Sequence, residues 1–549
     1  MVVCQRSHST RRPVGERSIP ALAIAGTALF AAIAVASPAA AQTVQQMREQ
    51  MQQLQQQLLQ QMQQIQAQQQ TIQQLQDRLA GMSSTVEKQQ QDLSTVKAEQ
   101  EKIQEKPPAV AAAGPGTGRI GPVNGRLGIY TTDAEGRQTG IALVGRLQFD
   151  VGDYFQTGRP GPDARTAPDL NSGYNLRRGR IGVTGRYLGD WQYDFVGEFG
   201  GVNTNELSAS ILTASASYLG LKPVIFTIGY QDVFASFAEA VSSADITFNE
   251  RPAISNITNS IAGSEPRAAF ATIASGERWY AAGYLSGSQA GVAGNDEQAA
   301  VVGRAVYLPV RTEDAFLHVG INGSYVFQPN QNIATRSAAG INSTGGAGIS
   351  ATTIALSDRP ELRIDPTPLI NTGTINATHA DTYGIELAGS WKSLWFDGEY
   401  QIVGVDQLQS SSATPAPFLT FDGGYGEVGW FITGEHRPYS TARAAWTTLQ
   451  PKEPFSPPHG GWGAWEIAAR YSHANLNDHA NHGVPTTVTG GVFGGVQDIF
   501  QIGLNWYPTT NVRFLLDYLF ADVNKFAANG INQQGQRFQA VALRTQINW

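Results

Sequence analysis

The chain has 549 residues, of which 15% are charged and 41% are hydrophobic, and it contains 59 glycines. Outside the N-terminus it has no stretch of about 18 apolar residues, which argues against transmembrane helices but not against a β-barrel, whose strands turn only alternate residues to lipid. The formal net charge of −7 gives no support to nucleic-acid binding.

The first 41 residues have the pattern of a secretory signal peptide. Four arginines precede an apolar stretch over 21–36, and Ala39–Ala41 offers a small-residue cleavage site before Gln42. The alternative, an uncleaved anchor, is disfavoured because the apolar stretch is short. The only cysteine, Cys4, lies in this segment, so the mature chain is predicted to have no disulfide and no thiolate chemistry. Its 34 basic and 44 acidic residues give a formal charge of −10.

A heptad repeat from Val44 to about Ile103 predicts an α-helical coiled coil within residues 42–106. Fourteen of its eighteen a and d positions are apolar, while Gln dominates elsewhere, which favours a coiled coil over a disordered Gln-rich segment. Residues 107–125 are rich in Pro and Gly and are expected to form a linker.

From residue 126 to residue 549 the apolar pattern has the period of two that is typical of β-strands. The fold class predicted is an all-β transmembrane barrel of about sixteen antiparallel strands. The predicted strands are 141–155, 176–187, 191–200, 209–219, 224–231, 267–274, 278–286, 300–308, 316–327, 382–391, 394–405, 421–434, 462–474, 497–507, 511–523 and 536–549, of which 209–219 and 421–434 are the least regular.

The connections between the predicted strands alternate between tight turns and long, Gly-rich loops, as in bacterial outer-membrane barrels. Segment 435–461 is an exception, because it is long where a tight turn is due. Aromatic residues near strand ends, including Trp395, Trp506 and Tyr507, fit the girdles at the membrane interfaces. The last strand ends on the aromatic Trp549, so we expect recognition by the barrel assembly machinery and insertion into outer-membrane lipid. A soluble multi-sheet protein would not need both an apolar outer face and a polar interior.

Several segments resemble the phosphate-selective porin O/P family. They are Gly145–Asp150, Asn175–Gly185, Ser243–Pro252, Gly463–Ser472, Gly503–Tyr507 and Asn511–Phe514, and the resemblance extends over roughly 125–549. It implies a sixteen-stranded, homotrimeric outer-membrane channel for small anionic solutes, preceded by a periplasmic coiled coil. It also implies that the third external loop, about 232–266, and the long segment 435–461 fold into the barrel.

The alternation of side chains along the predicted strands turns a set of arginines toward the lumen. A row of guanidinium groups would ease the passage of anions by charge-assisted hydrogen bonds. Arg251 and Arg267 border the expected constriction loop, and Lys452 is the one barrel lysine that could enter the lumen. The predicted solute pathway is Arg146, Arg178, Arg180, Arg186, Arg251, Arg267, Lys452 and Arg470. The alternative is that such arginines only pair with wall carboxylates, for example Arg146 with Asp150 or Arg470 with Glu466.

Two other functions remain open: a barrel that mainly anchors the envelope through its coiled coil, and an outer-membrane enzyme. The sequence has no catalytic motif, and we expect no cofactor and no catalytic residue. A group comprising His473, Asp478, His479 and His482 matches no metal-binding spacing, so no metal site is predicted.

Overall fold

The computed structural model describes residues 116–158, 168–201, 209–290, 297–330, 352–409 and 414–549. The expected signal peptide and coiled coil lie outside these residues. Within the part of the chain that the structure describes, no helix combines the length and the apolar character needed to cross a bilayer.

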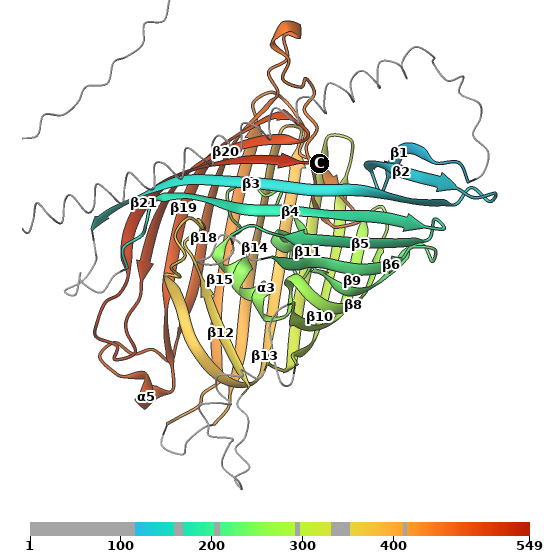
Figure 1. The fold of residues 1–549 in the computed structure, drawn as a ribbon. Coiled ribbons are helices and arrows are strands. Elements are labelled where there is room, and N and C mark those ends of the chain that lie inside the picture. Colours follow the sequence, from blue (N-terminus) through green and yellow to red (C-terminus); the bar gives the residue numbers. More distant parts are fainter. Residues whose placement is uncertain (1–115, 159–167, 202–208, 291–296, 331–351, 410–413) are drawn as a thin grey trace, which may run out of the picture. The chain divides into compact units, whose positions relative to one another are not determined.

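Among the described residues, sixteen antiparallel strands form a closed ring (Figure 1). In order around the ring they are β3 (Gln138–Gly158), β4 (Gly173–Tyr187), β5 (Trp191–Glu198), β6 (Ser210–Tyr218), β7 (Val224–Val233), β8 (Ser264–Ser275), β9 (Trp279–Gln289), β10 (Ala299–Arg311), β11 (Ala315–Gln328), β13 (Ile370–Trp391), β14 (Leu394–Gln407), β15 (Leu419–Phe431), β18 (Ala464–Asp478), β19 (Val492–Thr509), β20 (Val512–Asn524) and β21 (Gln536–Asn548). The ring closes where β21 pairs with β3, with Arg544 opposite Asp150. Each of the sixteen predicted strands is present, so the prediction of a sixteen-stranded barrel is confirmed.

The period of two seen in the sequence corresponds to two faces of the barrel wall. On β21, Val541, Leu543, Ile547 and Trp549 are 36–44% exposed on the outside, whereas Arg544 and Gln546 are buried on the inside. The expected girdle position of Trp395 is wrong. Its ring points inward, where its Nε1 donates a hydrogen bond to Glu466 at 2.9 Å, because it shares the inner face of β14 with Asp397 and Glu399.

Three further strands of the sheet are not members of the closed ring. β12 (Thr353–Asp358) pairs with the first part of β13, which therefore begins twelve residues before its predicted start at 382. β1 (Arg119–Val123) and β2 (Arg126–Thr132) form a hairpin, and β2 pairs with β3 just beyond the end of β21. The expected linker 107–125 thus contains a strand in its described part, because Asn124 and Gly125, both with positive φ, make a tight turn there.

The two ends of the barrel differ. Tight turns join β4 to β5, β8 to β9, β13 to β14 and β19 to β20 at one end, here called the turn side, and long connections lie at the other, the loop side. The connection between β7 and β8 contains α2 (Phe237–Ala240) and α3 (Ala253–Ala262), and α3 lies inside the ring (Figure 1). The remaining short elements are β16 (Tyr439–Ser440), β17 (Ala445–Trp446), a 3-10 helix (Pro457–His459) and α5 (Thr486–Thr489).

The interior is not uniformly polar. Ile254, Ile257 and Ile261 of α3 are buried in an apolar cluster that includes inward-facing residues such as Tyr284 and Val302. A polar lumen was expected all round, whereas one side of the interior is an apolar core. The open, polar space lies on the side of β3 and β4.

Candidate permeation pathway

The long connection over 234–263 crosses the interior and is fixed there by inward-facing polar side chains. Glu399 accepts a hydrogen bond from the backbone N–H of Phe237 at 2.6 Å, and Asp517 accepts one from Asn249 N–H at 2.7 Å. Arg513 donates to the carbonyl of Ile246 at 2.7 Å. Buried backbone groups need such partners, so the polar inner faces of the strands are what allow an irregular segment to enter the barrel.

The segment 435–461 also enters the barrel, as the family resemblance implied. Trp446 is buried, and its Nε1 donates to Asp397 at 2.8 Å. Arg304 donates to the carbonyl of Ala444 at 2.7 Å while it pairs with Glu386 at 2.9 Å. Both ends of the barrel are therefore narrowed by chain that folds inward.

Two polar cavities remain on either side of the connection 234–263. The loop-side cavity has a volume of about 440 Å³, and its charged lining residues are Arg177, Arg178, Arg180, Arg251, Arg363, Glu198, Glu239 and Glu250. The turn-side cavity has a volume of about 950 Å³ and lies at the rim of the barrel, where its lining includes Arg126, Arg146, Asp245, Arg443, Asn548 and the outward-facing Trp549. Arginine is the commonest charged residue in both linings.

Ser243 lies between arginines of the two cavities. Arg180, from the loop-side cavity, donates to its hydroxyl at 3.4 Å, and Arg146, from the turn-side cavity, donates to the same oxygen at 2.5 Å. Arg146 also reaches Ser242 Oγ at 3.0 Å. Arg146 and Arg180 are direct partners across β3 and β4, and Arg178 lies two residues from Arg180 along β4. The three guanidinium groups thus form a row that leads from one cavity to the other.

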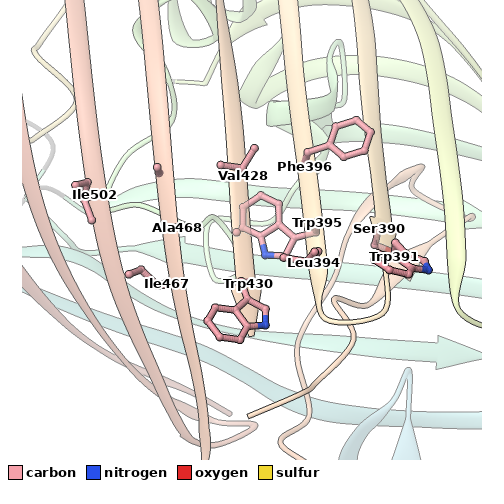
Figure 2. Close-up of a pocket in the computed structure, with 12 residues that line it drawn as sticks. Ser390, Trp391, Leu394, Trp395, Phe396, Val428, Trp430, Ile467, Ala468 and Ile502 are labelled. Atoms are coloured by element: carbon pink, nitrogen blue, oxygen red, sulfur yellow. The ribbon is translucent and has the colours of Figure 1, made fainter. Parts of the chain in front are cut away.

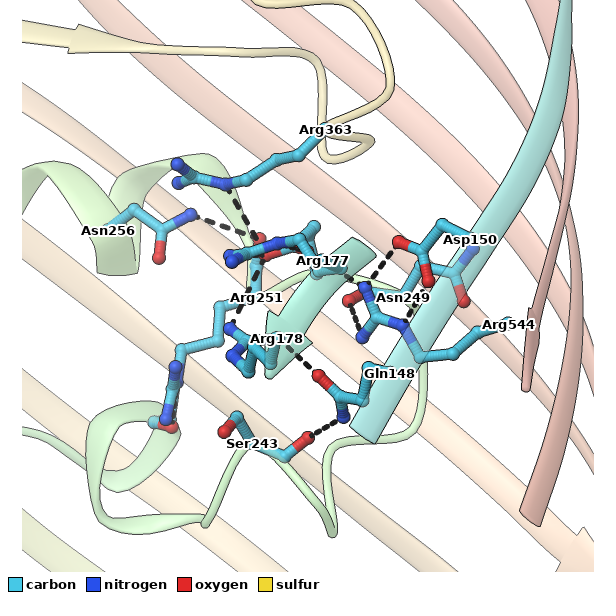
Figure 3. Close-up of polar contacts among 12 residues, drawn as sticks. Gln148, Asp150, Arg177, Arg178, Ser243, Asn249, Arg251, Asn256, Arg363 and Arg544 are labelled. Carbon is cyan, nitrogen blue, oxygen red and sulfur yellow. Dashed lines mark hydrogen bonds and ion pairs between the residues drawn. The ribbon is translucent and has the colours of Figure 1, made fainter. Parts of the chain in front are cut away.

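A dense charged cluster forms one wall of the loop-side cavity (Figure 3). Arg177 makes two hydrogen bonds to Glu250, at 2.5 and 2.9 Å, and Arg544 and Arg363 contact the same carboxylate at 3.0 and 3.3 Å. Burial alone would raise the pKa of Glu250, but the guanidinium groups of Arg177, Arg178 and Arg544 hold it well below its usual range. The ionised carboxylate is therefore the favoured form of Glu250.

Four of the predicted pathway residues line the cavities: Arg146, Arg178, Arg180 and Arg251. Arg178 donates to Gln148 at 2.8 Å, and Arg180 pairs with Glu198 at 2.6 Å. Arg251 is directed toward α2, because it donates to the carbonyls of Ala238 and Val241 at 2.8 Å each.

The other four are not part of either lining. Arg186 donates to Asn124 and to the carbonyl of Gly189, beside the turn after β4. Arg267 donates to three backbone carbonyls around the end of α3, and Lys452 donates to the carbonyl of Gly434 at 2.5 Å from an exposed position.

Arg470 is buried between Glu361, at 2.6 Å, and Glu427, at 3.0 Å. Wall pairs thus exist, but with other partners than those considered from the sequence. Asp150 pairs with Arg544 rather than with Arg146, and Arg470 pairs with Glu361 and Glu427 rather than with Glu466.

Sequence reasoning missed Arg177 and Arg363. Regular alternation that places Arg178 and Arg180 inside the barrel would turn Arg177 to the lipid side, but the register shifts there. Gln148 lies opposite Arg178 and Phe149 opposite Leu176, so Arg177 is an extra residue of a β-bulge and turns inward. Two adjacent arginines in a membrane strand are the signal that could have indicated the bulge, because strict alternation would place one of them in lipid.

The histidines at the end of β18 and in the connection after it have other partners. His473 contacts Asp498 at 2.8 Å, and His479 contacts Asp478 at 3.1 Å. His482 packs edge-on against Phe526. Across the described ranges, no three His, Cys, Asp or Glu side chains converge as metal ligands would.

A depression of about 640 Å³ on the outside of the barrel has a different character (Figure 2). Outward-facing Trp391, Leu394, Phe396, Val428 and Trp430 line it, and it spans β13, β14, β15 and β18. Its apolar surface suits the hydrocarbon region of a bilayer rather than an ionic solute.

A closed ring of strands with an apolar exterior, inward-folded connections and charged internal cavities defines an outer-membrane channel of the porin class. The chain belongs to the phosphate-selective porin O and P family, whose model matches residues 141–549. This family comprises channels and not enzymes, so the protein is a porin without enzymatic activity.

Two relatives are similar to this chain over more than two thirds of its length. Porin O of Pseudomonas aeruginosa is 23% identical over 432 residues, which cover 75% of this chain and 89% of that protein. An uncharacterized protein of Caulobacter vibrioides is 26% identical over 388 residues, which cover 69% of this chain and 68% of that protein. Among solved structures, the anion-selective porin from Comamonas acidovorans is 10% identical, covering 75% of this chain and all of that one, with a TM-score of 0.42.

Proposed function

We propose that this porin lets small anions, phosphate-like solutes among them, diffuse passively across the outer membrane. The observation that carries the proposal is the row of Arg178, Arg180 and Arg146, which leads from the loop-side cavity past Ser243 to the turn-side cavity. An anion would move along this row by exchanging hydration for guanidinium hydrogen bonds. Several weak sites in series allow both entry and exit.

The chemistry of the row favours anions in general over a trap for phosphate alone. Beyond residue 125 the chain has only four lysines, Lys222, Lys392, Lys452 and Lys525, and none of them lines either cavity. Carboxylates stand beside the arginines, as Glu198 does beside Arg180. We therefore infer a moderate preference for anions with weak binding of each one.

The remaining pathway candidates are proposed to act through positioning. Arg251 and Arg267 hold the inward-folded connection, Arg470 fixes Glu361, and Arg186 and Lys452 hold backbone carbonyls on the turn side. Each is proposed to shape the passage rather than to contact the solute.

The proposal extends to the assembly. We propose that three copies form a homotrimer, that residues 1–41 are a cleaved signal peptide, and that residues 42–106 form a coiled coil in the periplasm. Trp549 is proposed as the signal for the barrel assembly machinery. These proposals rest on the sequence patterns and on membership of the porin family.

Planar-bilayer recordings of the purified full-length protein test the function. We expect stepwise conductance increases on insertion and a reduction of chloride current by added inorganic phosphate. A barrel that serves only as an envelope anchor would give no conductance steps. That result would contradict the channel function and support the anchor function. If added phosphate leaves the chloride current unchanged, phosphate-like anions are excluded from the proposed solutes.

A further inference from the structure

The carboxylate of Glu250 occupies a position that suits a bound anion. It is 3% exposed and lies within 4 Å of guanidinium groups from three separate parts of the chain: Arg177 and Arg178 of β4, Arg544 of β21, and Arg363 of the connection between β12 and β13. Glu250 itself belongs to the connection 234–263. Its side chain thus reaches the arginines in the same way as a free oxyanion would.

The cluster has more positive charge than its carboxylates neutralise. Four guanidinium groups face Glu250, and within the described residues their ion pairs add two further carboxylates, Asp150 on Arg544 at 2.7 Å and Asp358 on Arg363 at 3.1 Å. One positive charge therefore remains in excess. A buried excess charge favours the entry of an anion from the adjoining cavity.

The cluster also has an unused donor. Arg178 is buried, and among the described residues no atom accepts a hydrogen bond from its Nε. Its Nη2 is 3.9 Å from Glu250, too far for a hydrogen bond. Arg177, Arg178, Arg363 and Glu250 all line the loop-side cavity. The Nε atom itself is buried, so a solute oxyanion would reach it by taking the place of Glu250.

We propose that Arg177, Arg178 and Arg363 form an oxyanion-binding site whose resident occupant is the carboxylate of Glu250. A phosphate or carboxylate solute that enters the loop-side cavity competes with Glu250 for these guanidinium groups. The tethered carboxylate of Glu250 returns when the solute leaves. This competition keeps the residence time of the solute short and the flux high. Glu250 therefore sets how tightly the pore holds its anions.

This inference rests on the proposed anion passage, and its test separates the two. The full-length protein and its Glu250→Gln variant are compared in planar bilayers by the concentration of inorganic phosphate, or of succinate, that halves the chloride current. The control is Asp365→Asn, which removes the same charge from a buried carboxylate of the neighbouring connection that is held by Asn171 and Thr367.

We expect Glu250→Gln to lower the half-inhibiting concentration by about tenfold, the scale of one charge contact in a partly screened site, and the control to change it by less than about twofold. A response to phosphate without one to succinate would mean that the site accepts phosphate and not carboxylates. Equal shifts in the variant and the control, or no shift in either, would overturn the inference. If the native protein shows no anion preference by reversal potential, the proposed function fails instead.

A second pair of variants decides the matter if Glu250→Gln does not fold. Arg363→Gln removes one guanidinium from the cluster and leaves Glu250 in place, whereas Arg278→Gln alters an exposed arginine that donates to the carbonyl of Pro309. Arg363→Gln should raise the half-inhibiting concentration several-fold above that of Arg278→Gln. Equal values for the two variants would refute the site.

Discussion

Arg178, Arg180 and Arg146 lie within hydrogen-bond reach of side chains that are not carboxylates. Gln148 accepts from Arg178, and Ser243 accepts from both Arg180 and Arg146. Neutral partners leave the positive charge of a guanidinium available to a passing anion, whereas a carboxylate such as Glu466 would cancel it. Arg178, whose hydrogen bond goes to Gln148, therefore differs from Arg470, which is held between two glutamates, whereas Arg180 also pairs with Glu198 at 2.6 Å.

Removal of two members of this row tests its role. We expect Arg178→Ala combined with Arg180→Ala to lower the anion-to-cation permeability ratio by roughly fivefold, since one unit charge near a protein surface contributes on the order of 1 kcal/mol or more. The measurement is the reversal potential across a salt gradient. The matched control is Arg137→Ala combined with Arg537→Ala, two exposed arginines that pair with Asp133 and Asp522. Equal ratios in the native and double-variant proteins would remove Arg178 and Arg180 from the pathway.

Asp245 is a titratable carboxylate in the lining of the turn-side cavity. Burial raises the pKa of this aspartate above its usual range, although Arg146, Arg513 and Arg443 oppose the rise, and Thr448 donates a hydrogen bond to it. Because its neutral form is favoured, falling pH removes its negative charge sooner than that of an ordinary aspartate, while the arginines stay charged.

We therefore expect the anion-to-cation permeability ratio to rise as the pH falls from about 7 to about 4. The Asp245→Asn variant should show, throughout this pH range, the high permeability ratio that the native protein reaches only at low pH. A variant that keeps the full pH dependence of the native protein would show that another group is responsible.

The individual strands could be predicted from the sequence, because in each strand apolar outward-facing residues alternate with polar inward-facing ones. Val541, Leu543 and Ile547 alternate with Arg544 and Gln546, and the membrane outside and the polar interior make that alternation obligatory. The alternation fails where the backbone departs from regular pairing. The bulge at Arg177 shifts the alternation by one residue, as the pairing with β3 shows.

The interior connections could be predicted less well, for a different physical reason. Ile254, Ile257 and Ile261 have the i, i+3, i+7 spacing of an amphipathic helix, so α3 could have been found. The partners of α3 could not be found in the same way, because β12, β14, β15 and β18, which pack against it, are distant in sequence. The same holds for Glu250, whose four arginines come from three segments.

The attachment of α3 gives a prediction about stability. Arg267 donates to the carbonyls of Ser260, Gly263 and Gly287 at 2.6–2.8 Å and is buried. Arg267→Met would leave these carbonyls without that donor, so we expect the free energy of unfolding to fall by about 2–4 kcal/mol. The measurement is gel electrophoresis of samples heated to a series of temperatures. It gives the temperature at which the band of the folded barrel disappears.

Arg537→Met is the control, because Arg537 is exposed and its pair with Asp522 contributes about 0–1 kcal/mol. An Arg267→Met protein that melts at the native temperature but loses its anion preference would place Arg267 in the pathway and not in the support of α3.

At the scale of the whole molecule, the barrel and the proposed coiled coil are separate predictions. The heptad repeat of residues 42–106 predicts that this segment alone is helical and oligomeric, since its apolar a and d positions need a partner helix. Circular dichroism and sedimentation of the isolated segment measure both properties. A monomer in sedimentation would exclude the coiled coil and remove one support for a trimer.

The central claim is that a charged passage between the two cavities makes this porin prefer anions. The most direct test is the reversal potential of the full-length protein in a bilayer that separates two concentrations of potassium chloride. The account predicts a potential whose sign reports chloride as the more permeant ion. A potential of the opposite sign, reporting potassium as the more permeant ion, would contradict it.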